Sequence, residues 1–90
     1  MKRLILKIHG KVHGVFFRSS SKEKAVQLGL VGYVKNSIDG AVELVAEGEE
    51  KALKELKQYC EDGTEYGSVS HVEEKLEDVD KVSFDDFKII

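Results

Sequence analysis

The sequence predicts a small α+β domain in which two helices cover one face of a β-sheet. The chain has 90 residues, 41% of them hydrophobic, which is enough for one hydrophobic core but not for two. Short segments of alternating hydrophobicity are interspersed with two segments of helical periodicity. No proline and no low-complexity tract marks an internal boundary. We therefore expect residues 1–90 to form a single domain.

The first strand and the first helix are predicted close to the N-terminus. Hydrophobic and polar side chains alternate over residues 3–12, as in a strand with one buried face. Ser20 followed by Glu23 matches a capping box, and Gly29 is a suitable stop signal. These signals predict a helix over residues 20–28.

A hairpin and a second helix are predicted in the middle of the chain. Residues 31–37 and 41–47 have strand composition and flank the pair Asp39-Gly40, which favours a tight hairpin turn. The two strands should therefore be antiparallel neighbours. Residues 49–62 carry a hydrophobic stripe at helical spacing, with acidic residues early, as the helix dipole prefers.

Two further strands complete the predicted fold. Residues 69–76 are rich in β-branched side chains, and residues 84–90 supply a short apolar fifth strand. The order strand-helix-strand-strand-helix-strand is that of a ferredoxin-like sandwich, with a four-stranded antiparallel sheet plus the short fifth strand and two helices on one face. The first strand should lie between the third and the fourth. The other face should expose charged residues: Arg3, Lys7, Lys11, Lys35 and Glu43.

Charge is distributed unevenly along the chain. Residues 1–36 hold eight Lys/Arg and one Glu, whereas residues 37–90 hold six Lys/Arg and sixteen Asp/Glu, for a net charge of −3. An anion should be drawn to the first part, although uneven solvated charge without a ligand is the alternative. The overall acidity disfavours nucleic acid as the main partner.

The lengths of the apolar segments indicate where in the cell the protein is expected. No apolar run approaches the roughly 18 residues of a membrane span, and the apolar segment after the basic start is too short for a signal peptide. We therefore expect no membrane association and a cytoplasmic chain. The single Cys60 has no partner for an internal disulfide.

The segment from Gly10 to Arg18 carries the main functional signal. It joins the first strand to the first helix, where successive backbone N–H groups can converge on an anion, aided by the positive end of the helix. Gly14 permits the dihedral angles that such a loop needs. Arg18 can hold two phosphate oxygens with its planar guanidinium. The glycine spacing alone is weak evidence, because it matches no P-loop or Rossmann fingerprint and is compatible with an ordinary turn.

Two motifs in order resemble those of the acylphosphatases, which hydrolyse the carboxyl-phosphate bond of small acyl phosphates to carboxylate and inorganic phosphate. The matching residues are Gly10-x-Val12-x-Gly14-Val15-x-Phe17-Arg18, Gly32-Tyr33-Val34-Lys35-Asn36 and Gly40-x-Val42. The resemblance extends over essentially the whole chain. It implies the ferredoxin-like fold, an acyl phosphate as substrate, phosphate as product and competitive inhibitor, and no metal or cofactor. A monomer is the default expectation for the oligomeric state.

The resemblance also assigns the site residues. It implies that Arg18 and Asn36 are catalytic, with Arg18 binding the phosphoryl group and Asn36 orienting the attacking water. The phosphate-binding loop comprises His13, Gly14, Val15, Phe16, Phe17 and Arg18. These few residues suffice chemically. The carboxylate leaving group needs little help from a general acid, and the phosphoryl group is transferred through a loose, metaphosphate-like transition state. Positioning and charge stabilisation should dominate catalysis.

The sequence departs from the family pattern at two places. His13 stands where the family most often has glutamine, and residues 63–67 lack the prolines that many relatives carry there. The His13 side chain either contacts the phosphate, so that phosphate affinity depends on pH, or points to solvent while only its backbone amide binds. The loop over residues 63–67 affects substrate contacts rather than the phosphate site.

Other residues have ordinary structural interpretations. His9 and His71 are predicted to be sheet residues, since neither has an acidic or metal-ligating partner nearby in sequence. Cys60 is predicted to be a core residue. The acidic segments 47–50 and 73–80 are predicted to be solvated. Four aromatic residues either flank the acyl group or pack in the core: Phe16, Phe17, Tyr33 and Tyr66.

Two alternative functions fit the same fold. A non-catalytic anion-binding module is one, since a fold does not determine a function; Asn36 argues against it, because binding alone has no need for a water-orienting amide. An RNA-binding domain is the other, but the predicted open faces of the first and third strands have no aromatic side chain on which bases could stack.

Overall fold

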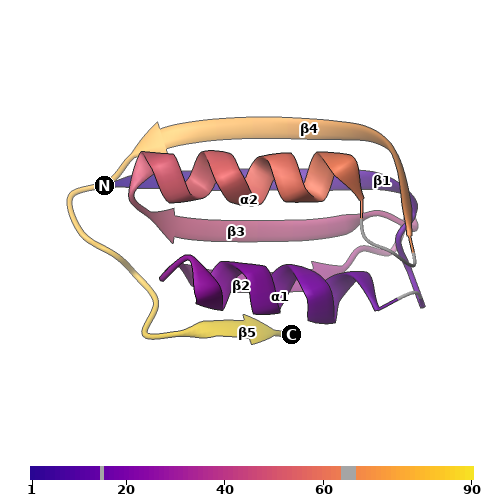
Figure 1. Cartoon of the computed structure of the whole chain (residues 1–90), viewed down its shortest axis with the longest axis horizontal. Coiled ribbons are helices and arrows are strands. Elements are labelled where there is room, and N and C mark those ends of the chain that lie inside the picture. The colour runs from indigo at the N-terminus through magenta and orange to yellow at the C-terminus, as the bar shows by residue number, and fades with distance from the viewer. Residues whose placement is uncertain (15, 64–66) are drawn as a thin grey trace.

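A computed structural model gives the fold and describes residues 1–14, 16–63 and 67–90. The element order is the predicted one, including the short fifth strand (Figure 1). The elements are β1 (Lys2–Lys11), α1 (Phe17–Gln27), β2 (Val31–Asn36), β3 (Val42–Gly48), α2 (Glu50–Asp62), β4 (Ser68–Asp78) and β5 (Phe87–Ile89). Both helices cover the same face of the sheet, which confirms the predicted two-layer α+β architecture.

The strands form one sheet in the order β4-β1-β3-β2-β5. β1 lies between β3 and β4 and is antiparallel to both, and β2 is antiparallel to β3, as predicted. β5 is parallel to β2, with Gly32 opposite Phe87 and Val34 opposite Ile89. The four principal strands are therefore antiparallel and the whole sheet is mixed. β5 also brings the C-terminal segment alongside β2, next to α1.

The hydrophobic core lies between the sheet and the two helices. Leu4, Leu6 and Ile8 of β1 alternate with less buried neighbours and point toward the helices. The helices contribute Phe17, Ala25, Leu53, Leu56 and Cys60. Burying each large apolar side chain stabilises the fold by about 1.5–3 kcal/mol. This packing fixes the position of α1 relative to the end of β1, where the predicted phosphate loop lies.

Helix α1 begins earlier than predicted, and the predicted capping box at Ser20 is wrong. The cap residue is Phe16, in the left-handed region with φ 63° and ψ 15°. Ser20 lies one turn inside the helix, where its backbone N–H donates to the Phe16 carbonyl at 3.0 Å. The local Ser-x-x-Glu pattern could not reveal that the loop enters the helix through a left-handed residue. The predicted stop is confirmed, since Gly29 has φ 74°.

The β2–β3 connection is a wider turn than a two-residue hairpin. The Ser37 N–H donates to the Ala41 carbonyl at 2.8 Å, and the Gly40 N–H donates to the Ser37 carbonyl at 3.2 Å. Three residues therefore form the loop, with Gly40 at a positive φ, as in hairpins that combine a type I turn with a bulge. The carboxylate of Asp39 accepts a hydrogen bond from the Ala41 N–H. This turn determines where Asn36, the last residue of β2, lies.

The open face of the sheet carries charged residues, as predicted, but one acidic residue was misplaced by the sequence interpretation. Glu47 is fully buried rather than solvated. Its carboxylate accepts hydrogen bonds from Arg3 Nε at 2.6 Å and from the Ser83 N–H at 2.5 Å. Burial by itself would raise the pKa of Glu47, but the Ser83 amide and the Arg3 guanidinium outweigh it and keep this pKa below its ordinary value. Glu47 thus connects β1, β3 and the segment that leads to β5.

Among the described residues, no helix is both long enough and apolar enough to cross a membrane.

Candidate active site

A cleft of about 300 Å³ lies where β1 ends and α1 begins. It is lined by Val12, Gly14, Phe16, Phe17, Arg18, Ser19 and Ile89. The loop after β1 and the β2–β3 turn lie at the same end of the molecule (Figure 1). The predicted loop therefore borders an open cleft rather than forming a simple surface turn.

The backbone at this cleft presents hydrogen-bond donors. Among the described residues, the Ser20 N–H donates to the Phe16 carbonyl at the start of α1, and the N–H groups of the first turn have no carbonyl acceptor within the helix. Phe16, at the cap position, has no side-chain oxygen to accept from them, and the first turn contains no acidic residue. Partial positive charge is thus concentrated at the N-terminus of α1. An anion in the cleft would be attracted to it.

Arg18 lies in the first turn of α1, is half-buried and lines the cleft. Within the described part of the chain, its guanidinium makes no hydrogen bond and no ion pair with another residue. A guanidinium can donate several parallel hydrogen bonds to an oxyanion. Arg18 and the N-terminus of α1 therefore bring positive charge to the same cleft.

His13 makes a contact that neither predicted alternative included. Its Nε2 lies 2.6 Å from the Ala41 carbonyl oxygen, so the ring donates to the backbone at the end of the β2–β3 turn. The side chain thus joins the loop to the turn, 28 residues away in sequence. A glutamine amide could donate the same hydrogen bond, because it also carries N–H donors.

Asn36 is exposed at the end of β2, opposite Val42 of β3. Alternation along β2 puts its side chain on the face of buried Val34, which is the face that the helices cover. Ile89, which pairs with Val34, also lines the cleft. Asn36 and Arg18 therefore belong to the same layer and the same end of the molecule. In the described residues no hydrogen bond joins Asn36 directly to Arg18 or to the loop.

The remaining predicted site residues fall into three groups. Phe16 is 68% exposed and lines the cleft, whereas Phe17 is buried in the core. Tyr33 packs edge-to-face against Phe84, with ring centroids 5.8 Å apart, outside this cleft. Packing is thus the observed use of Tyr33 and Phe17. The predicted loop residue Val15, and Tyr66, lie outside the described residues.

Three residues that line the cleft were not among the predicted site residues: Val12, Ser19 and Ile89. Val12 belongs to the motif that resembles the family. Ser19 is adjacent to Arg18 and could have been included from its position in the first turn. Ile89 could not, because it reaches the cleft only through the parallel pairing of β5 with β2. Local sequence patterns contain no signal for that long-range pairing.

Two predictions concerned residues away from the cleft. Cys60 is a fully buried core residue, as predicted, and burial raises the pKa of its thiol to about 12, which is unsuited to a nucleophile. His9 and His71 are sheet residues, as predicted, in β1 and β4. An acidic partner, which the sequence interpretation did not find, is nevertheless present in space. His9 Nε2 lies 2.7 Å from a carboxylate oxygen of Glu73, which is distant in sequence but lies on the adjacent strand.

Comparison with known proteins agrees with the observed fold. The family model described as acylphosphatase matches residues 4–89. An acylphosphatase of Caldanaerobacter subterraneus subsp. tengcongensis is 42% identical over 90 residues, covering 99% of each chain. The crystal structure of an acylphosphatase from Bacillus subtilis superposes with a TM-score of 0.92 at 30% identity, covering 100% of this chain and 99% of that one.

A second solved structure gives the same result. An acylphosphatase from Coxiella burnetii superposes with a TM-score of 0.88 at 38% identity, covering 99% of this chain and 92% of that one. The sequence similarity and the structural similarity thus extend over nearly the full length of the present chain and of these three relatives. The chain belongs to the acylphosphatase family, enzymes that hydrolyse acyl phosphates.

Proposed function

We propose that this chain hydrolyses small acyl phosphates in the cleft between β1 and α1, without a metal ion. In this proposal, Arg18 and the backbone amides of residues 13–18 bind the phosphoryl group, and Asn36 orients the nucleophilic water. The observation that carries the proposal is the combination of Arg18 with the N-terminus of α1 in one cleft. The single domain predicted from the sequence is part of the proposal, supported by one continuous core.

The electrostatics of the cleft suit phosphoryl transfer. The transition state spreads negative charge over the three equatorial oxygens of the transferring group. Donors that are already in place stabilise this charge without reorganisation. The first turn of α1 is held by the buried Phe17, so its amides are fixed relative to the cleft. Removing one such donor in comparable sites costs about 3 kcal/mol, or roughly a hundredfold in rate.

Asn36 is suited to aligning a water molecule. Its carboxamide contains an acceptor and two donors, so its oxygen can accept a hydrogen bond from the water and hold the water's lone pair toward phosphorus. It cannot act as a strong base, and a phosphate oxygen of the substrate would accept the proton. Pairing with Val42 of β3, next to the hydrogen bond from the Ser37 N–H to the Ala41 carbonyl, fixes the backbone at this position. The carboxylate product leaves without a general acid, because it is already a stable anion.

In this proposal His13 is a positioning residue. Its hydrogen bond to the Ala41 carbonyl connects the phosphate loop to the turn that follows Asn36. The two halves of the site are thereby linked: the anion-binding loop after β1 and the water-orienting residue at the end of β2. The role requires only a donor at this point, which agrees with glutamine being usual at the equivalent position in the family.

The proposal includes three finer points. The enzyme acts as a monomer, inorganic phosphate inhibits competitively because it occupies the phosphoryl position, and the location is cytoplasmic. The buried Cys60 thiol, free of disulfide partners, is compatible with a reducing compartment. Size-exclusion chromatography with light scattering and cell fractionation test the first and the last of these points.

Hydrolysis of benzoyl phosphate, measured in the presence of a chelator, tests the proposed function. We expect full turnover with the chelator present, and competitive inhibition by inorganic phosphate. Loss of turnover on chelation would contradict the metal-free mechanism. Inhibition by phosphate that is not competitive with benzoyl phosphate would contradict a shared phosphoryl position.

A further inference from the structure

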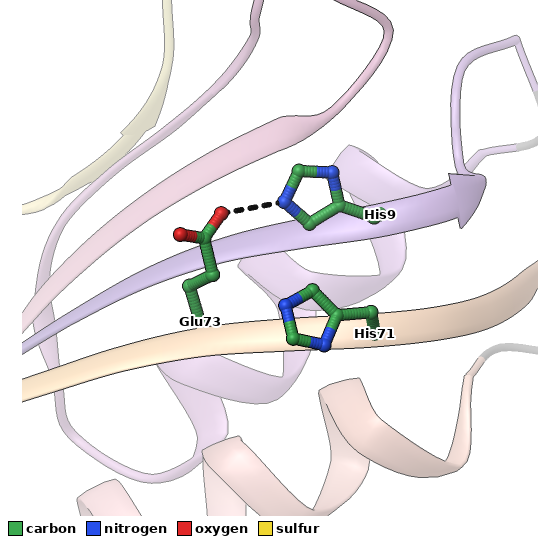
Figure 2. Close-up of side chains that lie close together, drawn as sticks. All are labelled: His9, His71 and Glu73. Carbon is green, nitrogen blue, oxygen red and sulfur yellow. Dashed lines mark hydrogen bonds and ion pairs between the residues drawn. The ribbon is translucent and has the colours of Figure 1, made fainter.

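A second cluster of functional groups lies on the open face of the sheet. His9 of β1 stands directly opposite His71 of β4, and Glu73 follows two residues further along β4. Because alternate residues share a face, all three side chains emerge on the same side. Figure 2 shows the two imidazole rings side by side, with the Glu73 carboxylate directed at His9. Glu74, the next residue, pairs with Lys57 of α2, which confirms that Glu73 faces away from the helices.

The three groups are close enough to share one ion. His9 Nε2 and a Glu73 carboxylate oxygen are 2.7 Å apart. The centroids of the His9 and His71 rings are 5.3 Å apart, with an angle of 32° between the planes. One ligand atom from each of the three residues lies within 4.8 Å of the other two. Two imidazoles and one carboxylate are a common set of ligands for zinc.

We propose that His9, His71 and Glu73 form a binding site for a divalent transition metal ion such as Zn²⁺. A tetrahedral zinc ion with ligands at about 2.0–2.1 Å holds their donor atoms about 3.4 Å apart. The observed spacings, from 2.7 Å to at most 4.8 Å, bracket this value. Small rotations of the exposed side chains therefore suffice. The ion takes the place of the proton that His9 and Glu73 share, and water completes the coordination.

The nature of the ligands selects the class of ion. Imidazole nitrogen favours Zn²⁺, Cu²⁺ and Ni²⁺, whereas Mg²⁺ and Ca²⁺ prefer an all-oxygen environment. The cluster offers one carboxylate and two imidazoles, so the hard cations should bind poorly. The site lies on the open face of the sheet, whereas the phosphate cleft lies on the helix-covered side. Metal binding here is therefore separate from the proposed hydrolysis.

Neighbouring charges permit a cation at this position. Lys7 stands opposite Glu73 on the same face of the sheet and acts electrostatically on it. Its ammonium group lies 2.7 Å from Asp39, however, which partly compensates its charge. Repulsion between Lys7 and an ion in the cluster is therefore reduced.

Titration of the full-length, metal-free chain with Zn²⁺ against a chromophoric chelator tests the proposal. We expect one Zn²⁺ per chain in the wild type. The double variant His9→Gln/His71→Gln should bind Zn²⁺ at least about tenfold more weakly. The matched control is His13→Gln, which removes the third histidine outside the cluster and should bind Zn²⁺ like the wild type.

A thermal shift provides a readout of folding. Zn²⁺ should raise the Tm of the wild type and of His13→Gln, because it binds only the folded chain, and should leave the double variant unchanged. Equal affinity of the double variant and the wild type would overturn the proposal. So would loss of binding in His13→Gln, or a stoichiometry of one ion per two chains, which would indicate ligands from separate copies. Hydrolysis of benzoyl phosphate by the double variant, measured with chelator, should match the wild type.

Discussion

The two arginines of the chain illustrate two uses of the same side chain. Arg3, near the start of β1, contacts Glu47 at 2.6 Å, Glu77 at 3.1 Å and the Ser83 hydroxyl at 3.2 Å. Arg18, just beyond the other end of β1, lines a cleft and has no polar partner among the residues the structure describes. The guanidinium of Arg3 is matched by carboxylates of the fold, whereas that of Arg18 is placed where a substrate anion could match it.

The difference between the two arginines distinguishes a charge that stabilises the fold from a charge that is available to a substrate. The hydrogen bond to Glu47 contributes most to raising the pKa of Arg3. The charged form of this arginine is therefore stabilised by contacts within the folded protein. Its removal should affect folding. An arginine whose donors face a cleft contributes little to folding and is available to stabilise charge that develops in a transition state. Its removal should affect turnover instead.

The largest effect is expected for Arg18→Ala. Loss of the guanidinium should lower kcat for benzoyl phosphate by at least a hundredfold to a thousandfold, about 3–4 kcal/mol in transition-state stabilisation. Phosphate binding should weaken strongly, while the melting temperature stays close to that of the wild type. Lys22→Ala, one turn further along α1, is the matched control and should retain activity. Near-normal turnover by Arg18→Ala would contradict the proposed site.

Asn36→Ala should separate catalysis from binding. Because the carboxamide is proposed to act on water rather than on the phosphoryl group, kcat should fall by about a hundredfold. The inhibition constant for inorganic phosphate should remain that of the wild type. Lys35→Ala, whose side chain lies on the opposite face of β2, serves as control. A parallel loss of phosphate affinity in Asn36→Ala would instead indicate a binding role.

Glu47→Gln tests the structural arginine through its partner. The substitution replaces charge-assisted hydrogen bonds in a buried site and should cost about 2 kcal/mol in the free energy of unfolding at pH 7, with little change in kcat. Urea denaturation measures the loss. Glu43→Gln, which removes a half-exposed carboxylate 3.7 Å from Lys35, is the control and should cost less than about 1 kcal/mol.

The same variant has a defined pH dependence. The pKa of Glu47 is lower in the folded state than its ordinary value of 4.5. Its contribution to stability is therefore present above about pH 4.5 and is lost as the pH falls through the lower, folded-state pKa. The stability difference between wild type and Glu47→Gln should shrink in that acidic range. A difference that stays constant below pH 4 would show that the charge of Glu47 does not stabilise the fold.

The smallest effect is expected for His13→Gln. Glutamine can also donate to the Ala41 carbonyl, so kcat at neutral pH should change little, whereas His13→Ala should weaken phosphate binding by about fivefold through loss of one hydrogen bond. The inhibition constant for inorganic phosphate measures this loss. A loss of about fivefold in His13→Gln as well would contradict the role of His13 as a donor to the turn.

Sequence patterns predicted the fold where its determinants are local. Alternation located β1, a hydrophobic stripe located α2, and the order of elements indicated the position of β1 inside the sheet. Long-range contacts were not predictable in the same way. Nothing local distinguishes buried Glu47 from its solvated neighbours, because its partners Arg3 and Ser83 lie 44 and 36 residues away. The pairing of His9 with Glu73 was missed for the same reason.

The candidate site shows the same division. The resemblance to a family supplied Arg18, Asn36 and the loop, and these assignments remain predictions that the variants above test. The left-handed start of α1 was not predictable, since a phenylalanine at that position is unusual. Nor was the contact of His13 with Ala41, which depends on the packing of two loops. The conformation at the start of α1 and the contact of His13 with Ala41 both depend on tertiary structure rather than on residue type.

The left-handed Phe16 has a consequence for protein engineering. A non-glycine residue in this conformation is disfavoured by about 1–2 kcal/mol, and a routine redesign for thermostability would exchange it for aspartate or serine to cap the helix. Such a side chain would occupy the donors at the start of α1 and, if acidic, would repel the substrate. A more heat-resistant but slower catalyst should result, so optimisation of this scaffold should leave position 16 untouched.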